Sequence, residues 1–281
     1  MSKSLFKLLP FIAGVFFSCT KEDPPEPATV CQPIEYLHLS HTRTDFFPYI
    51  APSVGEIDYS KFDMLWLGGD LAKYTSEHVR TMDYIDSVFD VGNDNTLWAL
   101  GNHDYSDLNL VEEYTNRPPY YTFHRNGITF LVLDTQDSLS SILGDQKELL
   151  EAVCDTIQQS SHLILLHHKL VWLYNNPYLQ PYHLSLANAP LGNCFSCLQP
   201  NNFSLEIFPK LLEVKQREIE VICIGGDLGF QTGEFEYRSP EGIQFLASGI
   251  NGDPAQDKAL LFCHDIAKGS LVWEYKLVSE L

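Results

Sequence analysis

Four apolar runs in this chain of 281 residues end in clusters of side chains that can bind a metal ion or a phosphate group. The clusters are Gly68-Gly69-Asp70, Gly101-Asn102-His103-Asp104, His167-His168 and Gly225-Gly226-Asp227. Glycine before a polar residue lets the backbone turn sharply and bring that side chain close to a bound ion. Carboxylate, carboxamide and imidazole ligands of this kind suit Zn, Mn or Fe. One such cluster is usually a turn, but four in succession predict a shared site.

A further cluster, Ser40-His41-Thr42-Arg43, follows the apolar residues Tyr36, Leu37 and Leu39. His41 can ligate a metal ion, whereas Arg43 cannot and stays charged at any physiological pH. A guanidinium group can instead hold two phosphate oxygens as a fork. The residue types alone leave metal ligation, phosphate binding and no function open for this pair.

The elements that must position these clusters alternate between strand-like and helix-like patterns. Apolar runs predict strands at Leu37–Leu39, Met64–Leu67, Thr96–Leu100, Thr129–Leu133, Leu163–Leu166 and Val221–Ile224. Apolar residues at helical spacing predict helices over Glu77–Phe89 and Asp145–Gln158, the second with Asp145 as its N-cap. This alternation predicts an α/β core with parallel strands, whose carboxyl ends bring the polar clusters to one edge.

The later part of the chain follows other patterns. Closely spaced strands with little helix predict a meander at Phe235–Arg238, Ile243–Ala247, Ala259–His264 and Leu271–Leu277. The segment Leu170–Phe203 holds aromatic residues among Asn and Pro, which predicts a long structured loop. Such loops are often functional lids, and the alternative is an excursion packed on the surface. Its aromatic rings suit stacking on a sugar or base as well as packing.

The order of the clusters resembles the calcineurin-like metallophosphoesterase family, which includes purple acid phosphatases and cyclic nucleotide phosphodiesterases. The resemblance runs from about Ile34 to the C-terminus. It includes Gly144–Val153, similar to the family's Gln-containing helix, and Gly242–Gly252, similar to its late glycine-rich strand. It implies a four-layer α/β/β/α sandwich of two mixed sheets, with two metal ions at the strand ends.

The resemblance also implies a set of metal ligands. Asp70 would bridge both ions, and Asn102 and His167 would bind the second ion. His167 matches the family's ligand better than His168, on the family's spacing to a following proline. Asp227 stands where the family has the first His of its GHxH motif, and a carboxylate is a competent ligand.

The chain departs from the family where the first ion would bind. His41 and Arg43 replace the Asp and His of the family's DxH motif, and Gly229 replaces the last His of GHxH. We therefore expect one divalent transition metal ion (Zn, Mn or Fe), with Arg43 placing a fixed positive charge where the other ion would lie. The resemblance implies that His103 protonates the leaving oxygen and that Asp104 orients His103, while His41 helps to position the attacking water.

The N-terminus predicts export. Lys3 and Lys7 flank the start of an apolar run, Leu8–Phe17, which is too short to span a bilayer. Cys19 follows directly, as in a bacterial lipoprotein signal, and Thr20–Asp23 resembles the tether of Bacteroidetes lipoproteins exposed on the outer membrane. The alternative is an ordinary secretory signal. We predict a signal peptide at 1–18, a lipidated Cys19 with a Pro-rich tether at 19–33, and a phosphoesterase domain at 34–281.

The cysteines are consistent with an oxidising compartment. Cys194 and Cys197 can form a zinc half-site or a redox pair, but no second CxxC completes four zinc ligands. We therefore expect a local disulfide between them. Cys223 and Cys263 lie in strand-like runs, which leaves core packing or one bridge open for them.

Charge and motifs narrow the function further. A formal net charge of −19 and the lack of a basic patch argue against nucleic-acid binding. No G-x-S-x-G motif indicates a Ser-His-Asp hydrolase. Two hypotheses remain for this membrane-anchored envelope protein: an enzyme that hydrolyses a phosphorylated small molecule or a phosphodiester, and a pseudoenzyme that keeps the fold as a binding or structural surface lipoprotein.

Overall fold

The computed structural model describes residues 33–44, 47–186, 188, 199–229 and 232–281. Its strands are β1 (Ile34–Leu39), β2 (Met64–Leu67), β3 (Thr96–Trp98), β4 (Tyr121–Arg125), β5 (Ile128–Val132), β6 (His162–His167), β7 (Glu220–Gly225), β8 (Glu234–Arg238), β9 (Gln244–Ser248), β10 (Lys258–Asp265) and β11 (Ser270–Leu277). Its α-helices are α1 (Pro52–Gly55), α2 (Val79–Phe89), α3 (Leu108–Thr115), α4 (Gly144–Thr156), α5 (His183–Leu186) and α6 (Phe208–Lys215). A π-helix covers Phe203–Ile207, and 3₁₀ turns cover Tyr59–Lys61, Asp137–Ser140, Val171–Leu173, Gln180–Tyr182 and Val278–Glu280.

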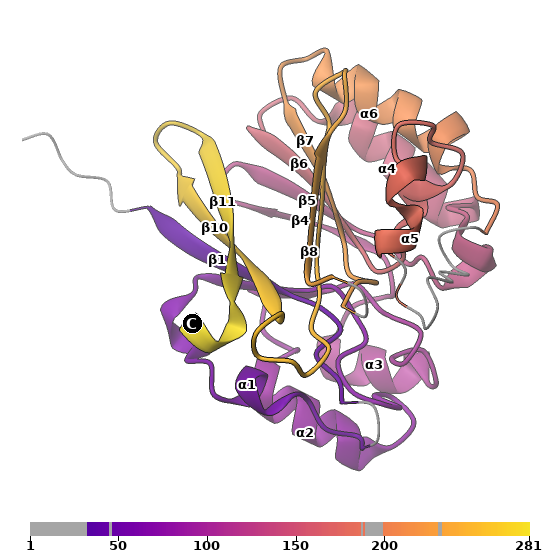
Figure 1. Ribbon diagram of the computed structural model, residues 1–281. Coiled ribbons are helices and arrows are strands. Elements are labelled where there is room, and N and C mark those ends of the chain that lie inside the picture. Colours follow the sequence, from indigo (N-terminus) through magenta and orange to yellow (C-terminus); the bar gives the residue numbers. More distant parts are fainter. Residues whose placement is uncertain (1–32, 45–46, 187, 189–198, 230–231) are drawn as a thin grey trace, which may run out of the picture. The chain divides into compact units, whose positions relative to one another are not determined.

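The strands form two mixed sheets (Figure 1). The five-stranded sheet has the order β11-β10-β1-β2-β3, and the six-stranded sheet has the order β4-β5-β6-β7-β9-β8. Strands β1, β2 and β3 are parallel to one another, as are β5, β6, β7 and β9. Parallel pairing brings their carboxyl ends to one edge of each sheet, where the predicted polar clusters begin.

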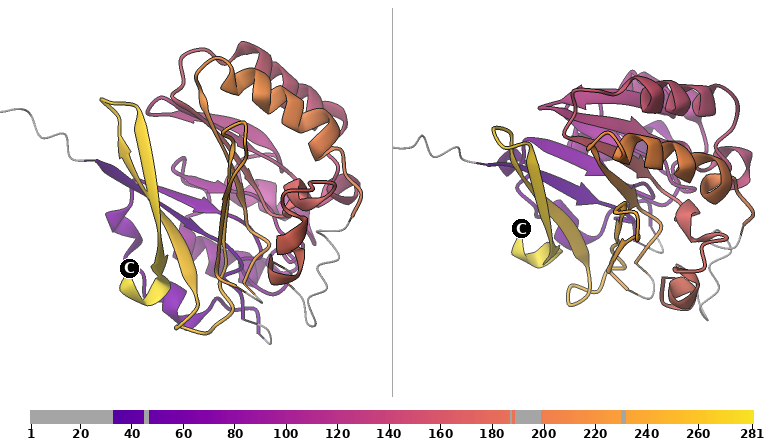
Figure 2. Two further views of the ribbon diagram at one scale, coloured as in Figure 1. Left: turned by 45° about the horizontal axis from the view of Figure 1, so that its top comes forward. Right: turned by 90° about the horizontal axis from the view of Figure 1, so that it is seen from above.

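The central strands are buried on both faces, because successive side chains point alternately to the space between the sheets and to the helices outside them. Tyr36, Trp66, Phe130 and Phe262 meet between the two sheets and are fully buried. The outer face of the five-stranded sheet packs against α1, α2 and α3, and that of the six-stranded sheet packs against α4 and α6. Helices α4 and α6 lie side by side on that face (Figure 2). These layers give the helix–sheet–sheet–helix order expected from the sequence.

Some elements differ from the prediction. Strand β4 was not predicted, because its residues are polar and mostly exposed at the edge of a sheet. The N-cap of α4 is Leu143, so Asp145 lies in the first turn, where a carboxylate still favours the helix dipole. The predicted meander is divided, because β8 and β9 belong to one sheet while β10 and β11 belong to the other.

The segment after β6 is more ordered than a loop, since it contains two 3₁₀ turns and α5. Cys223 and Cys263 are free thiols, so the alternative of one bridge between them is wrong. The predicted signal peptide (1–18) and the predicted tether (19–33) up to residue 32, with Cys19, lie outside the described residues, as do Cys194 and Cys197. Within the described residues, no helix has the length and apolar character needed to cross a bilayer.

Candidate metal and phosphate site

Asp70 stands at the centre of a buried cluster at the carboxyl end of β2. Its side chain is 2% exposed and its backbone has a positive φ of 56°. Its Oδ2 lies 3.8 Å from Nε2 of His41, 3.7 Å from Nε of Arg43 and 3.9 Å from Nε2 of His103. Its Oδ1 lies 3.6 Å from Nε2 of His168 and accepts a 2.9 Å hydrogen bond from the backbone N–H of His103. Three imidazoles and one guanidinium therefore surround one carboxylate.

Backbone carbonyls orient two of the imidazoles. His41 Nδ1 lies 2.9 Å from the carbonyl oxygen of Ile250, and His168 Nδ1 lies 2.7 Å from that of Gly68. A carbonyl oxygen can only accept, so each contact places a proton on Nδ1 and leaves Nε2 on the side of the ring that faces Asp70. Both Nε2 atoms are buried and have no hydrogen-bond partner. A metal-ligating histidine is commonly held in this way, by a bond from its other ring nitrogen.

His168, and not the predicted His167, faces the cluster. His168 Nε2 lies 3.6 Å from Asp70 and 3.9 Å from Oδ1 of Asp227. His167 is the last residue of β6, and its Nδ1 bonds the carbonyl oxygen of Lys169 at 2.8 Å. Neighbouring residues of a strand point to opposite faces, so an assignment shifted by one residue selects the wrong imidazole.

Asp104 connects two glycine-containing loops by hydrogen bonds: the loop after β2, which contains Gly68-Gly69-Asp70, and the loop after β3, which contains Gly101. Its fully buried carboxylate accepts hydrogen bonds from the backbone N–H groups of Asp70 (2.6 Å), Leu71 (3.1 Å) and Gly101 (2.9 Å), and from the hydroxyl of Thr75 (2.5 Å). Burial, with the nearby charge of Asp70, raises the pKa of Asp104 to about 6. None of these hydrogen bonds involves the side chain of His103, which Asp104 was predicted to orient. They fix the backbone that presents Asp70.

Burial and charge act against each other on the central groups. Burial raises the pKa of Asp70, but the imidazoles of His168, His41 and His103 outweigh it and leave this pKa below its usual value. Burial lowers the pKa of His168, but the carboxylates of Asp70 and Asp227 outweigh it and raise this pKa. Burial lowers the pKa of both His41 and His103. Asp70 is thus held as a carboxylate that attracts cations.

Two predicted ligands lie differently in the structure. The Asp227 side chain is mostly buried, and its Oδ1 accepts a 2.8 Å hydrogen bond from Nδ2 of Asn188. Asn102 is exposed, and within the described residues its side chain has no hydrogen bond to the cluster. The strand before it ends at Trp98, so the intervening coil sets the direction of Asn102.

Sequence reasoning missed two polar residues at the same edge. Asp134, which follows β5, is buried and accepts a 2.7 Å hydrogen bond from the hydroxyl of Tyr105. Lys169 is half-buried beside His168, and burial lowers its pKa against the opposing charges of Asp227 and Asp134. The signal for Asp134 was available, because it is a carboxylate directly after a strand-like apolar run, as Asp70 is.

The donor groups suit a divalent metal ion in chemical type. One carboxylate oxygen of Asp70 and one of Asp227 lie within 3.9 Å of Nε2 of His168. The Nε2 atoms of His168 and His41 are buried without a hydrogen-bond partner. The separations of 3.6–3.9 Å are shorter than twice a metal–ligand bond of about 2.0–2.2 Å, so one ion can bond to both atoms of a pair. Among the described residues, no three His, Cys, Asp or Glu side chains are already gathered into a coordination group.

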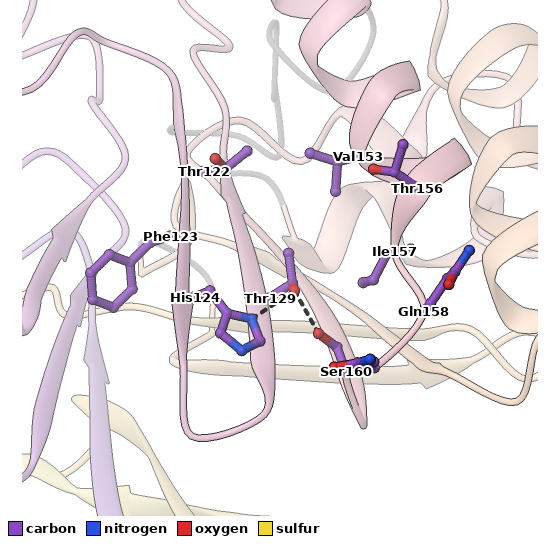
Figure 3. A pocket seen from close by; sticks show the side chains of 10 residues that line it. Thr122, Phe123, His124, Thr129, Val153, Thr156, Ile157, Gln158 and Ser160 are labelled. Carbon is purple, nitrogen blue, oxygen red and sulfur yellow. Dashed lines mark hydrogen bonds between the residues drawn. The ribbon is translucent and has the colours of Figure 1, made fainter.

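A separate pocket of about 450 Å³ lies away from this cluster. Thr122 and His124 of β4, Thr129 of β5, Val153 of α4 and Ser160 line it (Figure 3). It lies at the amino ends of β5 and β6, whereas Asp70 and its neighbours lie at the carboxyl ends of the strands. The pocket is therefore not part of the candidate site.

Comparison with solved structures identifies the fold. The chain is similar to a dimetal phosphatase from Danio rerio, with a TM-score of 0.54 and 13% identity, over 87% of this chain and 96% of that chain. A weaker similarity, with a TM-score of 0.45 and 14% identity, links it to a 5′-nucleotidase precursor from Thermus thermophilus, over 87% of this chain and 54% of that chain. No family model matches the chain, and no curated protein matches its sequence. The first similarity, with the two mixed sheets, confirms the predicted metallophosphoesterase-like fold.

Proposed function

We propose that this protein is a metal-dependent phosphoesterase that hydrolyses phosphate mono- or diesters, with one divalent transition metal ion and with Arg43 in place of a second. The observation that carries the proposal is the arrangement around Asp70, where three imidazole Nε2 atoms and the guanidinium of Arg43 lie 3.6–3.9 Å from one buried carboxylate. The fold shared with a dimetal phosphatase supports it.

Asp70, His168 and Asp227 are the residues that would hold the ion. His168 replaces the His167 of the sequence-based assignment because its Nε2 faces both carboxylates. Asn102 is left out of this set because its side chain is exposed. A bound divalent ion supplies positive charge to a phosphoryl oxygen and makes a nearby water more acidic.

Arg43 and His103 supply the remaining chemistry from the chain itself. Arg43 can hold two nonbridging phosphate oxygens and stabilise the charge that develops on them. The side chain of His103 is 25% exposed, so its imidazole can reach both the cluster and an entering substrate. In this proposal it donates a proton to the leaving oxygen, as general acids do. His41 can accept a hydrogen bond from the attacking water through its unpartnered Nε2.

We further propose that the domain is held on the cell envelope by a lipid on Cys19, which places the enzyme at the outer membrane. The support is the order of charged residues, apolar run and cysteine at the N-terminus. A Cys19→Ala variant should move from the detergent-extracted membrane fraction to the soluble fraction. Retention of that variant in the membrane would contradict lipid anchoring.

A second candidate function is a pseudoenzyme that binds a ligand or serves as a structural surface protein. The exposed position of Asn102, which the family uses as a ligand, favours it, as does the replacement of the DxH residues by His41 and Arg43. This alternative predicts that the protein hydrolyses no phosphate ester, whether or not it binds a metal ion.

Hydrolysis of nitrophenyl phosphate and bis-nitrophenyl phosphate separates the two functions. The metal-loaded protein should hydrolyse at least one of them, and chelation should abolish the activity until an ion is restored. A His103→Ala variant should lose most of the rate, whereas His78→Ala, which removes a side chain that is 69% exposed, should not. Equal rates for His103→Ala and wild type would support the pseudoenzyme.

A further inference from the structure

Two pockets flank the short segment Asn175–Pro177, which follows the 3₁₀ turn Val171–Leu173. One, of about 160 Å³, is lined by Tyr178, Phe208, Tyr237 and Glu241 among others. The other, of about 420 Å³, is lined by Tyr174, Gln180 and His183. Asn175, Asn176 and Pro177 line both, so the two pockets form neighbouring parts of one surface. None of the residues placed in the metal and phosphate site lines either pocket.

Tyrosine rings gather on this surface. Tyr178, which lines the smaller pocket, is 59% exposed, and Tyr182, four residues further along the chain, is 41% exposed. The ring of Tyr182 lies 6.4 Å from that of Tyr237, and Tyr237 stacks on the buried Phe245 at 6.4 Å. An exposed aromatic face offers an apolar platform with a negative quadrupole, which attracts the weakly positive C–H groups of a flat ring.

The polar groups of the two pockets are carboxamides, hydroxyls, one carboxylate and the imidazole of His183. Asn175, Asn176 and Gln180 can each donate and accept hydrogen bonds, and Glu241 accepts them. Among the described residues that line the pockets there is no Lys or Arg. A phosphate or sulfate group would therefore meet no fixed positive charge, and would face the carboxylate of Glu241.

The segment between the pockets is held in place before any ligand binds. Tyr174 carbonyl oxygen accepts a 2.9 Å hydrogen bond from Ser204, and His183 Nε2 contacts the carbonyl oxygen of Leu173 at 3.0 Å. Trp172 and Leu179 anchor it in the core with no exposed side-chain surface. A surface fixed in this way loses little conformational entropy when a ligand binds.

We propose that this surface is a binding site for a neutral saccharide. The apolar C–H face of a pyranose ring would lie on Tyr178 or Tyr237, and its hydroxyls would bond to the Asn175 and Asn176 carboxamides and to Glu241. A nucleotide also carries a ring that stacks, but its phosphates are excluded by the uncharged and acidic lining. The site is separate from the phosphoesterase site, so either assignment can fail without the other.

Affinity electrophoresis through gels that contain a soluble polysaccharide tests the proposal. The wild-type protein is run through gels with each of a set of neutral glycans (a mannan, a xylan, a β-glucan and an α-glucan) and each of two anionic ones (heparin and polygalacturonate). Isothermal titration with the matching oligosaccharide, and with AMP, then gives affinities. Tyr178→Ala and Glu241→Gln are compared with Tyr49→Ala, which removes a tyrosine that is 54% exposed on another surface.

At least one neutral glycan should retard the wild type and Tyr49→Ala, and Tyr178→Ala should bind its oligosaccharide at least tenfold more weakly. Tyr178→Phe should keep most of the affinity because it keeps the ring. Glu241→Gln should also weaken binding while leaving metal content and phosphatase rate unchanged. Lack of retardation by every neutral glycan, tighter binding of AMP or an anionic glycan, or equal affinity of Tyr178→Ala and wild type would each overturn the proposal.

Discussion

Asp104 gives the sharpest contrast between the role implied by family resemblance and the role that the structure shows. If Asp104 orients His103, its replacement lowers activity and leaves the fold intact. If Asp104 holds the backbone of the two glycine loops, its replacement lowers the stability of the folded protein as well. The substitution Asp104→Asn separates the two roles, because it keeps the shape of the side chain and removes its charge.

The size of the effect follows from the hydrogen bonds. Oδ2 of Asp104 accepts from Asp70 and Gly101, and Oδ1 accepts from Leu71 and Thr75. An amide in this position keeps one oxygen, so its NH₂ group must face two donors. Thr75 can rotate its hydroxyl to accept, but the Leu71 N–H cannot. A lost hydrogen bond to a charged group costs about 1.5–3 kcal/mol, so we expect a loss of about 2–4 kcal/mol in the free energy of unfolding.

Urea unfolding at pH 7.5, followed by tryptophan fluorescence, measures this loss. Asp107→Asn is the matched control, because Asp107 is an exposed carboxylate that caps α3 through Asn109 and Leu110. Asn is as good an N-cap as Asp, so the control should change the free energy by less than about 0.5 kcal/mol. If Asp104→Asn is no less stable than Asp107→Asn but loses activity, the reasoning is refuted and the orienting role stands.

Three further outcomes follow from the structure. Arg43→Gln should lower kcat/KM for a nitrophenyl phosphate by about 100-fold, because it removes the fixed charge beside Asp70, and a loss below threefold would contradict this. His168→Asn should weaken metal affinity at least tenfold in a competitive chelator titration, whereas His167→Asn should not; the reverse order would restore the sequence-based assignment. Burial lowers the pKa of His162 to about 4, so the unfolded state binds more protons below pH 6.5, and the stability that the neutral imidazole contributes is lost as pH falls from 6.5 toward 4. His162→Gln should therefore lose less stability than wild type between pH 7 and pH 4.5, by up to about 2.4 kcal/mol in urea titrations, and parallel losses would contradict this.

Strand positions were predictable where an apolar run is buried on both faces. The predicted strand Met64–Leu67 has the same first and last residues as β2. Strand β7 extends the predicted strand Val221–Ile224 by one residue on each side. The carboxylates that follow these strands were predicted for the same reason, because a polar residue after a buried strand must lie at the edge of the sheet. In the structure Asp70 lies 3.6–3.9 Å from His41, His103 and His168, so these clusters come together at this edge.

Side-chain direction was harder to predict than position. His167 continues β6 for one residue past the last apolar residue, which turns its side chain away from Asp70 and brings in His168. Nothing in the residue types His167-His168 indicates where the strand stops. Asn102 depends in the same way on the path of a coil that begins after Trp98.

Long-range hydrogen bonds were not predictable from spacing. Asp104 bonds the N–H of Asp70 from 34 residues away, and only the pairing of β2 with β3 brings the two loops together. The residue types of Gly101–Asp104 indicated that this loop lies beside Asp70, but they did not indicate which groups the Asp104 carboxylate bonds. Strand β4 was missed because an exposed edge strand needs no apolar run.

The metal content of the purified protein tests the central claim most directly. After equilibration with Zn²⁺ or Mn²⁺ and removal of free ion, mass spectrometry of the digested sample gives the number of ions per chain. One ion per chain in the wild type, and less than a tenth of that in Asp70→Asn, is the predicted result. Two ions per chain would contradict the replacement of one ion by Arg43, and no bound ion would contradict a metal-dependent phosphoesterase.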